Sequence, residues 1–250
     1  MLIIAHRGAS GYAPENTLAA MDVAIRQGCD AIECDVQMTR DGYPVVCHDW
    51  TVDRTTNGTG AVEHLTLEEI RKFDAGSWFS KAFAGEKIPT LEEVMTYVPD
   101  TMLLNIEIKN KFVVSRDIEK KVVDLLIKYN RIDRTIVSSF NHLCLHRIKS
   151  LNRKIKIAVL LKVRLFEPWE YLEQSGLYVH SFHPRSDCVT PAMVRELQAR
   201  GVKVYCWTIN ELERAKHLEK MGVDGIITDF PAMLMDNEEL RMKNEVFWDL

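Results

Sequence analysis

Several features are absent from this 250-residue sequence, and each absence excludes a class of protein. No apolar run approaches the length of about 18 residues that a membrane-spanning helix needs. The formal net charge is −4, whereas a nucleic-acid-binding surface needs clustered positive charge. The six cysteines form no Cys-x-x-Cys pair and most lie in apolar stretches, so we expect reduced packing residues. Residues 1–5 lack the charged region and long apolar core of a secretory signal. We therefore expect a cytoplasmic protein with no membrane span and no nucleic-acid partner.

What the sequence does contain is a regular alternation of strand-like and helix-like segments. Hydrophobic residues make up 46% of the chain, enough to bury a large core. The runs that we expect to form strands are 2–5, 31–37, 102–109, 135–138, 156–160, 178–182, 202–207 and 225–228. Most are separated by a helical pattern, and eight parallel strands with intervening helices close a barrel. The sequence therefore predicts an α/β protein, a TIM (β/α)8 barrel.

Helix-boundary patterns support this count. Thr66–Glu69, Thr90–Glu93 and Asn210–Glu213 have the spacing of capping boxes, in which each end satisfies an unpaired backbone N–H of the first helical turn. Thr190 followed by Pro191 is a typical helix start. Between residues 161 and 176, the sequence defines no full helix.

One segment, residues 51–89, breaks the alternation. It contains several turn signals, one short helical pattern and four aromatic residues, Phe73, Trp78, Phe79 and Phe83. Connections of this length are usually functional or form a small insertion. We expect a single domain over residues 1–250, with 51–89 as a small cap insertion after the second strand, over the barrel mouth. The aromatic residues are expected to form the core of the cap more than to contact a substrate.

Two of the predicted strands carry carboxylates at alternate positions. Glu33 and Asp35 share one face of the second strand, and Glu107 and Lys109 share one face of the third. Taken alone, each segment is typical of a half-solvated strand. In a barrel, however, helices cover the outer face, so these side chains point inward, where unpaired carboxylates are costly. An all-carboxylate set favours a hard divalent ion such as Mg²⁺ or Ca²⁺ over Zn²⁺.

Two histidines follow predicted strand ends near these carboxylates. His6 and Arg7 come directly after the first strand, and His48 follows the apolar run 45–47. Barrel enzymes place their catalytic groups at the carboxyl ends of strands. The planar guanidinium of Arg7 suits a phosphate or carboxylate, because it can bind two oxygens. The fixed positive charge of Lys109 fits either a ligand contact or a counter-ion to Glu107.

The chain also contains a series of short motifs in a characteristic order, and through them it resembles the glycerophosphodiester phosphodiesterase family along essentially its whole length. The matching stretches are His6-Arg7-Gly8, Pro14-Glu15-Asn16-Thr17, Glu33-Cys34-Asp35-Val36-Gln37, Asp41-Gly42, His48-Asp49, 53–60, Ile106-Glu107-Ile108-Lys109 and Trp207-Thr208-Ile209-Asn210. The resemblance implies a metal-dependent hydrolase that splits glycerophosphodiesters, its small-molecule substrates, into glycerol 3-phosphate and an alcohol.

The resemblance also implies roles for individual residues. They are the metal ligands Glu33, Asp35 and Glu107, the acid–base pair His6 and His48, and the substrate-binding residues Arg7, Lys109 and Trp207. The metal would be Mg²⁺ or Ca²⁺, with Mn²⁺ as an alternative. Trp207 either packs against the substrate or plugs the barrel. The choice of acid and base, the nucleophile (water or a glycerol hydroxyl), the preferred headgroup and the oligomeric state stay open.

Two other functions fit the same scaffold. A lysophospholipase D would cleave lipid-bearing diesters and would need an apolar groove or a membrane-facing patch. A non-catalytic barrel that binds phosphorylated ligands would tolerate loss of a catalytic histidine or a metal-binding carboxylate. This sequence retains all five such residues: His6, Glu33, Asp35, His48 and Glu107.

Overall fold

The computed structural model describes residues 1–110 and 117–235, and the rest of the predicted 1–250 domain lies outside these ranges. Its parallel strands are β1 (Leu2–Ala5), β2 (Ala31–Met38), β4 (Leu103–Ile108), β5 (Thr135–Ser139), β6 (Lys156–Leu161), β7 (Ser181–Pro184), β8 (Lys203–Cys206) and β9 (Gly225–Thr228). They are hydrogen-bonded in the order β1-β9-β8-β7-β6-β5-β4-β2, and β1 pairs with β2 to close the ring. The predicted TIM barrel is confirmed.

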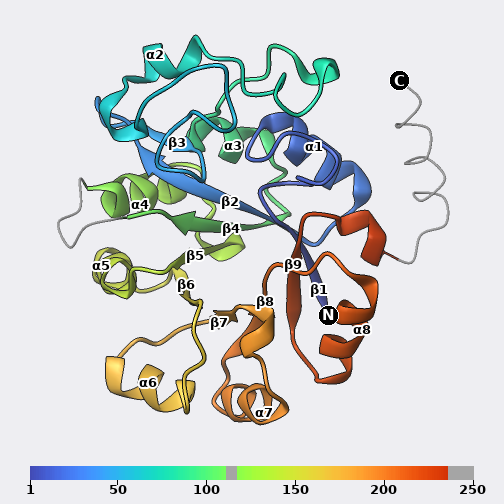
Figure 1. Cartoon of the computed structure of the whole chain (residues 1–250). Coiled ribbons are helices and arrows are strands. Elements are labelled where there is room, and N and C mark those ends of the chain that lie inside the picture. The colour runs from blue at the N-terminus through green and yellow to red at the C-terminus, as the bar shows by residue number, and fades with distance from the viewer. Residues whose placement is uncertain (111–116, 236–250) are drawn as a thin grey trace.

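Helices lie around the outside of the barrel (Figure 1). They are α1 (Leu18–Gln27), α3 (Leu91–Tyr97), α4 (Ile118–Lys128), α5 (His142–Leu151), α6 (Pro168–Ser175), α7 (Pro191–Ala199) and α8 (Leu212–Lys220). Short 3₁₀ turns are η3 (Ile132–Arg134), η4 (Ser186–Cys188) and η5 (Pro231–Leu234). The capping box at Thr90 and the Thr190-Pro191 start are present as predicted.

Two local predictions, the start of one strand and the cap at Asn210, were wrong, and the stretch 161–176, where no helix was placed, contains one. β7 begins at Ser181 and not at residue 178, because pairing with β6 starts there, and Tyr178 is 89% exposed. A helix, α6, does form after residue 161, with Pro168 in its first turn and Gly176 in a left-handed conformation at its end. Asn210 caps no helix, since its side chain binds the loop after β9 and α8 begins without a side-chain cap.

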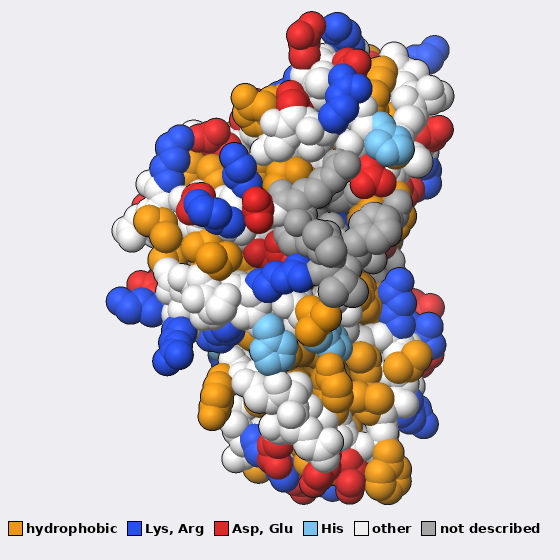
Figure 2. All heavy atoms as spheres, turned by 90° about the vertical axis from the view of Figure 1, so that its left-hand side faces the viewer, with side chains coloured by type: hydrophobic (Ala, Val, Ile, Leu, Met, Phe, Trp, Pro, Cys, Tyr) orange, Lys and Arg blue, Asp and Glu red, His pale blue; other side chains and the backbone are white. Residues whose placement is uncertain are grey.

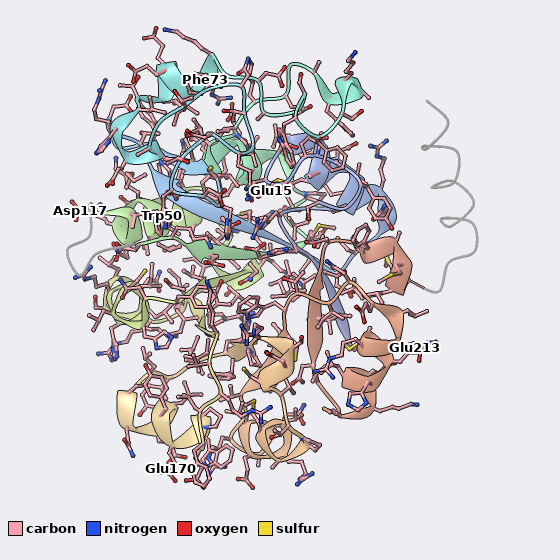
Figure 3. The ribbon with its side chains drawn as sticks, viewed as in Figure 1. Glu15, Trp50, Phe73, Asp117, Glu170 and Glu213 are labelled. Carbon is pink, nitrogen blue, oxygen red and sulfur yellow. The ribbon has the colours of Figure 1, made fainter. Side chains whose placement is uncertain are left out.

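The segment after β2 differs from the rest of the barrel. A short strand, β3 (Pro44–Val46), pairs antiparallel with β2. Residues 51–89 follow, with η1 (Val62–His64), α2 (Leu67–Arg71), capped by the predicted Thr66 box, and η2 (Lys81–Phe83). This segment has its own apolar cluster, against which Phe73 packs (Figure 3). The other three aromatic rings stack edge-to-face on one another.

The barrel interior changes from apolar to polar along the strands. A buried layer near the strand starts consists of Ile4, Ala31, Ile136, Ala158, Tyr205 and Ile227. Because alternate strand residues share a face, Glu33 and Asp35 follow Ala31 on the inner face of β2. The carboxylates therefore lie at the carboxyl ends of the strands, where barrels build their sites.

The surface charge and the state of the cysteines match what the composition predicts. On the face in Figure 2, basic and acidic side chains are interspersed and no field of one sign covers it. All six cysteines are buried and free. Within the described ranges, no helix is long and apolar enough to cross a membrane.

Candidate active site

Three carboxylates from two neighbouring strands meet inside the barrel mouth. Strand register places Asp35 of β2 beside Glu107 of β4. Glu33 lies one inward position earlier on β2, and oxygens of all three groups lie within 4.8 Å of one another. Their exposed fractions are 9% or less. The structure thus brings together the three residues that the sequence predicts as metal ligands.

Two cations accompany this carboxylate cluster. Lys109 Nζ lies 3.1 Å from Asp35 Oδ1 and 2.6 Å from Glu107 Oε1. Arg7 Nε lies 3.3 Å from Asp35 Oδ2, and the Arg7 backbone N–H donates to Glu33 Oε2 at 2.9 Å. Lys109 is therefore a counter-ion to Glu107, and it also contacts a second carboxylate.

The cations compensate the three carboxylates unequally. Burial raises the pKa of Asp35, but Lys109 and Arg7 more than offset it, so the pKa lies well below its usual range. Burial and the neighbouring carboxylates instead raise the pKa values of Glu33 and Glu107. Glu33 Oε1 is buried and has no hydrogen-bond partner among the described residues. The cluster therefore has excess negative charge and a buried oxygen directed at no donor, which fits an oxygen-liganded divalent cation.

His6 is held by a carboxylate from the last strand–helix connection. Its Nδ1 lies 2.6 Å from Asp229 Oδ1. Asp229 also accepts hydrogen bonds from Ser10 Oγ at 3.0 Å and Asn210 Nδ2 at 2.6 Å. Burial raises the pKa of Asp229, but these hydrogen bonds outweigh it and lower the pKa to about 2. An ionised carboxylate accepts a hydrogen bond from Nδ1–H, which leaves Nε2 of His6 for the pocket.

His48 is held in the same way from the other side. Its Nδ1 lies 2.6 Å from Asp49 Oδ1, and Arg54 Nε donates to Asp49 Oδ2 at 2.6 Å. The hydrogen bond from Arg54 is the main cause that lowers the pKa of Asp49 to about 2. Burial lowers the pKa of His48 itself. Both histidines thus present Nε2, with Nδ1 fixed by an aspartate.

Glu15 connects the first loop to segment 51–89. It accepts from Arg7 Nη1 at 2.8 Å, and Arg54 donates to both of its oxygens, at 2.8 and 2.7 Å. Figure 3 shows Glu15 where this segment meets the barrel. Asn16 donates to Asp35 Oδ2 at 2.9 Å. These bonds fix the guanidinium of Arg7 and the carboxylate of Asp35.

The backbone of the first loop explains why glycine follows His6-Arg7. Gly8 has φ +79°, and a Cβ there would lie 2.6 Å from the Ala20 carbonyl carbon. Only glycine allows this contact between the loop and α1. The close approach directs His6 and Arg7 towards the carboxylates.

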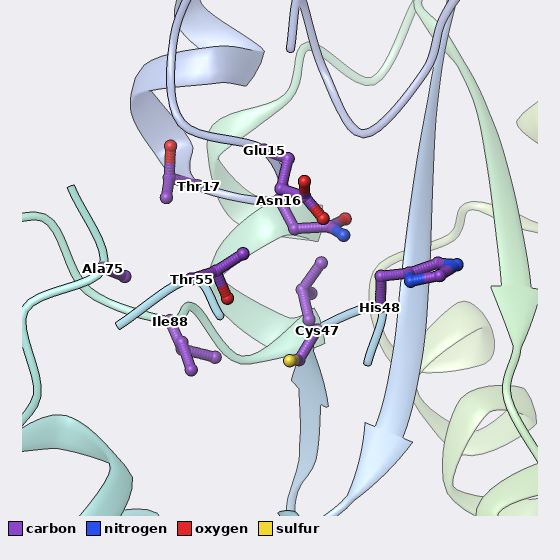
Figure 4. A pocket seen from close by; sticks show the side chains of 9 residues that line it. Glu15, Asn16, Thr17, Cys47, His48, Thr55, Ala75 and Ile88 are labelled. Carbon is purple, nitrogen blue, oxygen red and sulfur yellow. The ribbon is translucent and has the colours of Figure 1, made fainter. Parts of the chain in front are cut away.

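A pocket of about 80 Å³ joins these groups. Both histidines, Arg7, Lys109 and Trp207 line it. Trp207 stacks edge-to-face on Phe140, and its Nε1–H donates to the His183 carbonyl, so the ring forms a wall of the pocket. A separate cavity of about 10 Å³ lies behind the site, and the His48 ring points away from it (Figure 4).

Sequence reasoning missed the groups that hold the histidines. Asn210 received only a helix-capping role, and Asp229 received none, although Asp229 follows β9 directly and β9 pairs with β1, which ends next to His6. Asp49 was noted only as the neighbour of His48. Asp229 could have been found because closure of a barrel places its last strand beside its first, so the residues that follow β9 and β1 lie close together.

Comparison with known proteins places this site in a family. The model of the glycerophosphoryl diester phosphodiesterase family matches residues 6–233. A glycerophosphodiester phosphodiesterase of Caldanaerobacter subterraneus is 47% identical over 236 residues, covering 94% of this chain and 96% of the relative. One from Bacillus altitudinis is 38% identical, covering 92% and 94%.

A solved structure agrees with the sequence matches. A phosphodiesterase of Oleispira antarctica, in complex with the product sn-glycerol-3-phosphate, superposes with a TM-score of 0.88. It is 31% identical and covers 100% of this chain and 97% of its own.

Proposed function

The chain belongs to the glycerophosphoryl diester phosphodiesterase family, a family of enzymes, and from that premise we propose a metal-dependent hydrolysis at the carboxylate cluster. The substrates are glycerophosphodiesters, and the products are glycerol 3-phosphate and an alcohol. The observation that carries the proposal is the pair of aspartate-held histidines beside three converging carboxylates. The buried free cysteines suit the reducing cytoplasm that we propose as its location.

Glu33, Asp35 and Glu107 would hold a divalent cation, Mg²⁺ or Ca²⁺, with Mn²⁺ as an alternative. When bound, it would neutralise charge on the phosphate oxygens. The chain's own cations contribute to the same end. Arg7 lines the pocket with its guanidinium fixed by Glu15, and Lys109 lines it from β4. Both stabilise the charge that grows on non-bridging oxygens as the nucleophile attacks.

The histidines move the protons. A phosphodiester has a poor alkoxide leaving group, so a protonated imidazole donates to the departing oxygen through Nε2. The other imidazole, neutral, removes a proton from the nucleophile. Asp229 accepts the hydrogen bond from Nδ1–H of His6, and Asp49 accepts the one from His48. Each stabilises the imidazolium form of its histidine when that form arises. Trp207 provides an apolar wall for the carbon atoms of the substrate.

Release of the phosphate monoester product from a panel of diesters tests this function. That product is glycerol 3-phosphate for the deacylated diesters and its single-acyl counterpart for the acylated one. The panel contains glycerophosphocholine, glycerophosphoethanolamine, glycerophosphoglycerol and the single-acyl counterpart of the first. We expect turnover of the deacylated diesters by wild-type protein with Mg²⁺, Ca²⁺ or Mn²⁺. Turnover of the acylated compound alone would assign a lysophospholipase D, and metal binding without any turnover would assign a binding protein.

A bell-shaped dependence of kcat/KM on pH is expected, because the reaction needs one acid and one base. His6→Ala and His48→Ala should each remove the bell shape. A profile that stays intact in both variants would contradict the acid–base assignment.

A further inference from the structure

A second cavity, of about 600 Å³, opens beside the catalytic pocket. We call it the outer groove, and it is lined by His48, Asp49, Trp50, Thr51, Glu107, Ile108, Lys109, Asn110, Ser139, Phe140, Asn141 and Lys162. His48, Glu107, Lys109, Phe140 and Lys162 also line the catalytic pocket, so the two spaces are continuous. Ligand sites usually enclose about 300–1,000 Å³. The inner pocket is far smaller, whereas the outer groove has room for one arm of a diester.

The anionic side chains of the outer groove are already paired. Asp49 binds His48 and Arg54, and Glu107 binds Lys109 at 2.6 Å. Each carboxylate that lines the groove therefore has a cationic partner before a substrate enters.

Lys162 is the exception among these charges. It follows β6 and is exposed, and its ammonium lies 4.7 Å from the centre of the Phe140 ring. Within residues 1–110 and 117–235, no carboxylate lies within 4.0 Å of Lys162, whereas Lys109 contacts two. Among the described residues of the groove, Lys162 is therefore the cation without a carboxylate partner. A quaternary ammonium group of a substrate that approached the Phe140 ring would be repelled by the Lys162 ammonium, which lies over that ring.

We propose that the outer groove binds the alcohol arm of the substrate and that Lys162 selects arms bearing an anionic group, a phosphate or a carboxylate. The inference rests on the proposed function, since it names the substrate class of the same site. A charge-assisted hydrogen bond from the ammonium to an oxyanion is the interaction that distinguishes such arms from neutral ones. Lys162 is thus a specificity-determining residue, distinct from the cations that contact the reacting phosphate.

A matched pair of substrates isolates this contact. Glycerophosphoglycerol has a neutral alcohol arm, and the same diester with a phosphate on its terminal hydroxyl differs by one anionic group. The measured quantity is the ratio of their kcat/KM values. We expect wild-type protein to favour the phosphorylated diester, and K162Q to lower that ratio about five- to tenfold. K162R should largely preserve the ratio, and K162E should reverse it in favour of glycerophosphoglycerol.

Two controls separate this effect from general charge loss. Lys121 is exposed on α4 and does not line the groove, so K121Q removes the same charge elsewhere and should leave the ratio unchanged. Raising the ionic strength from about 0.05 to 0.5 M should lower the kcat/KM ratio of wild-type protein, because salt screens the contact with Lys162. The ratio of K162Q should not change.

Three results would overturn the inference. K162Q could leave the ratio unchanged, or it could lower turnover of both diesters equally, which would place Lys162 at the reacting phosphate. Failure of wild-type protein to hydrolyse any diester with any of the three metals would instead overturn the proposed function, and the inference with it.

Discussion

The two histidine neighbourhoods share one arrangement but depend on different parts of the chain. His6 contacts Asp229, which Ser10 and Asn210 hold within the loops of the barrel itself. His48 contacts Asp49, whose other oxygen is held by Arg54 of segment 51–89. One histidine is thus supported by residues at the closure of the barrel, the other by segment 51–89. Under the proposed function, segment 51–89 would therefore support one of the two acid–base groups through Arg54.

The largest effects should come from the imidazoles. His6→Ala and His48→Ala should each lower kcat about 10²–10⁴-fold, the usual contribution of general acid–base catalysis. Steady-state release of glycerol 3-phosphate measures the loss, with unchanged circular dichroism as the control for folding. A variant that retains more than about a tenth of wild-type kcat would remove that histidine from the chemistry.

The supporting aspartates should have the next largest effect. Asp229→Asn and Asp49→Asn keep the shape of the side chain but remove the charge that holds Nδ1–H. We expect losses in kcat of about 10–10²-fold, larger for Asp229, because it is the more buried of the two carboxylates. Equal pH profiles for the variants and wild-type protein would show that the aspartates only pack against the rings.

Arg54 tests the dependence on the insertion. Arg54→Gln should lower kcat about three- to tenfold, since it removes a bidentate pair with Glu15 and the contact with Asp49. In the double variant with Asp49→Asn, the loss in kcat should be smaller than the product of the two single losses, because both changes act on His48. Combined with Asp229→Asn, the two losses should multiply. If the losses in kcat multiplied in both double variants, Arg54 would not act through His48.

Among the described residues, a third histidine, His183, has no carboxylate within ion-pair distance. His183 is fully buried in the barrel with Ser181 Oγ as its partner, and burial lowers its pKa to about 3. The unfolded chain, with a pKa near 6.5, then binds the proton first. Stability is therefore full above about pH 6.5 and falls as the pH drops towards 3.

His183→Gln should accordingly flatten the acid side of the stability curve. The free energy of unfolding from urea titrations between pH 6.5 and 4.5 should fall less steeply with decreasing pH, by up to about 1.4 kcal/mol per pH unit. His64→Gln changes an exposed histidine and serves as the matched control. An unchanged slope in His183→Gln would show that His183 does not cause the acid sensitivity.

The barrel and its carboxylates were predictable because they follow from local periodicity. Alternation within 31–37 places Glu33 and Asp35 on one face, and a closed barrel turns that face inward. The prediction needed no knowledge of the three-dimensional partners. The same reasoning placed Glu107 on the neighbouring strand.

The supporting contacts could not be predicted in this way. His6 and Asp229 are 223 positions apart, and Glu15 and Arg54 are 39 apart. Such pairs depend on how the ring closes and on how an irregular insertion folds back, and neither leaves a periodic signal. Asn210 illustrates the error that results, since its capping pattern was locally plausible while its side chain bonds to Asp229.

The most direct test of the account is metal-restored release of glycerol 3-phosphate from glycerophosphoglycerol by chelated protein. Wild-type protein should regain turnover as Mg²⁺, Ca²⁺ or Mn²⁺ is added. Glu33→Gln, which keeps the size of the side chain, should regain at most about a hundredth of it and should bind the metal more weakly in a direct titration. Full turnover in the presence of chelator, or normal metal-restored activity in Glu33→Gln, would contradict a metal-dependent reaction at the three carboxylates.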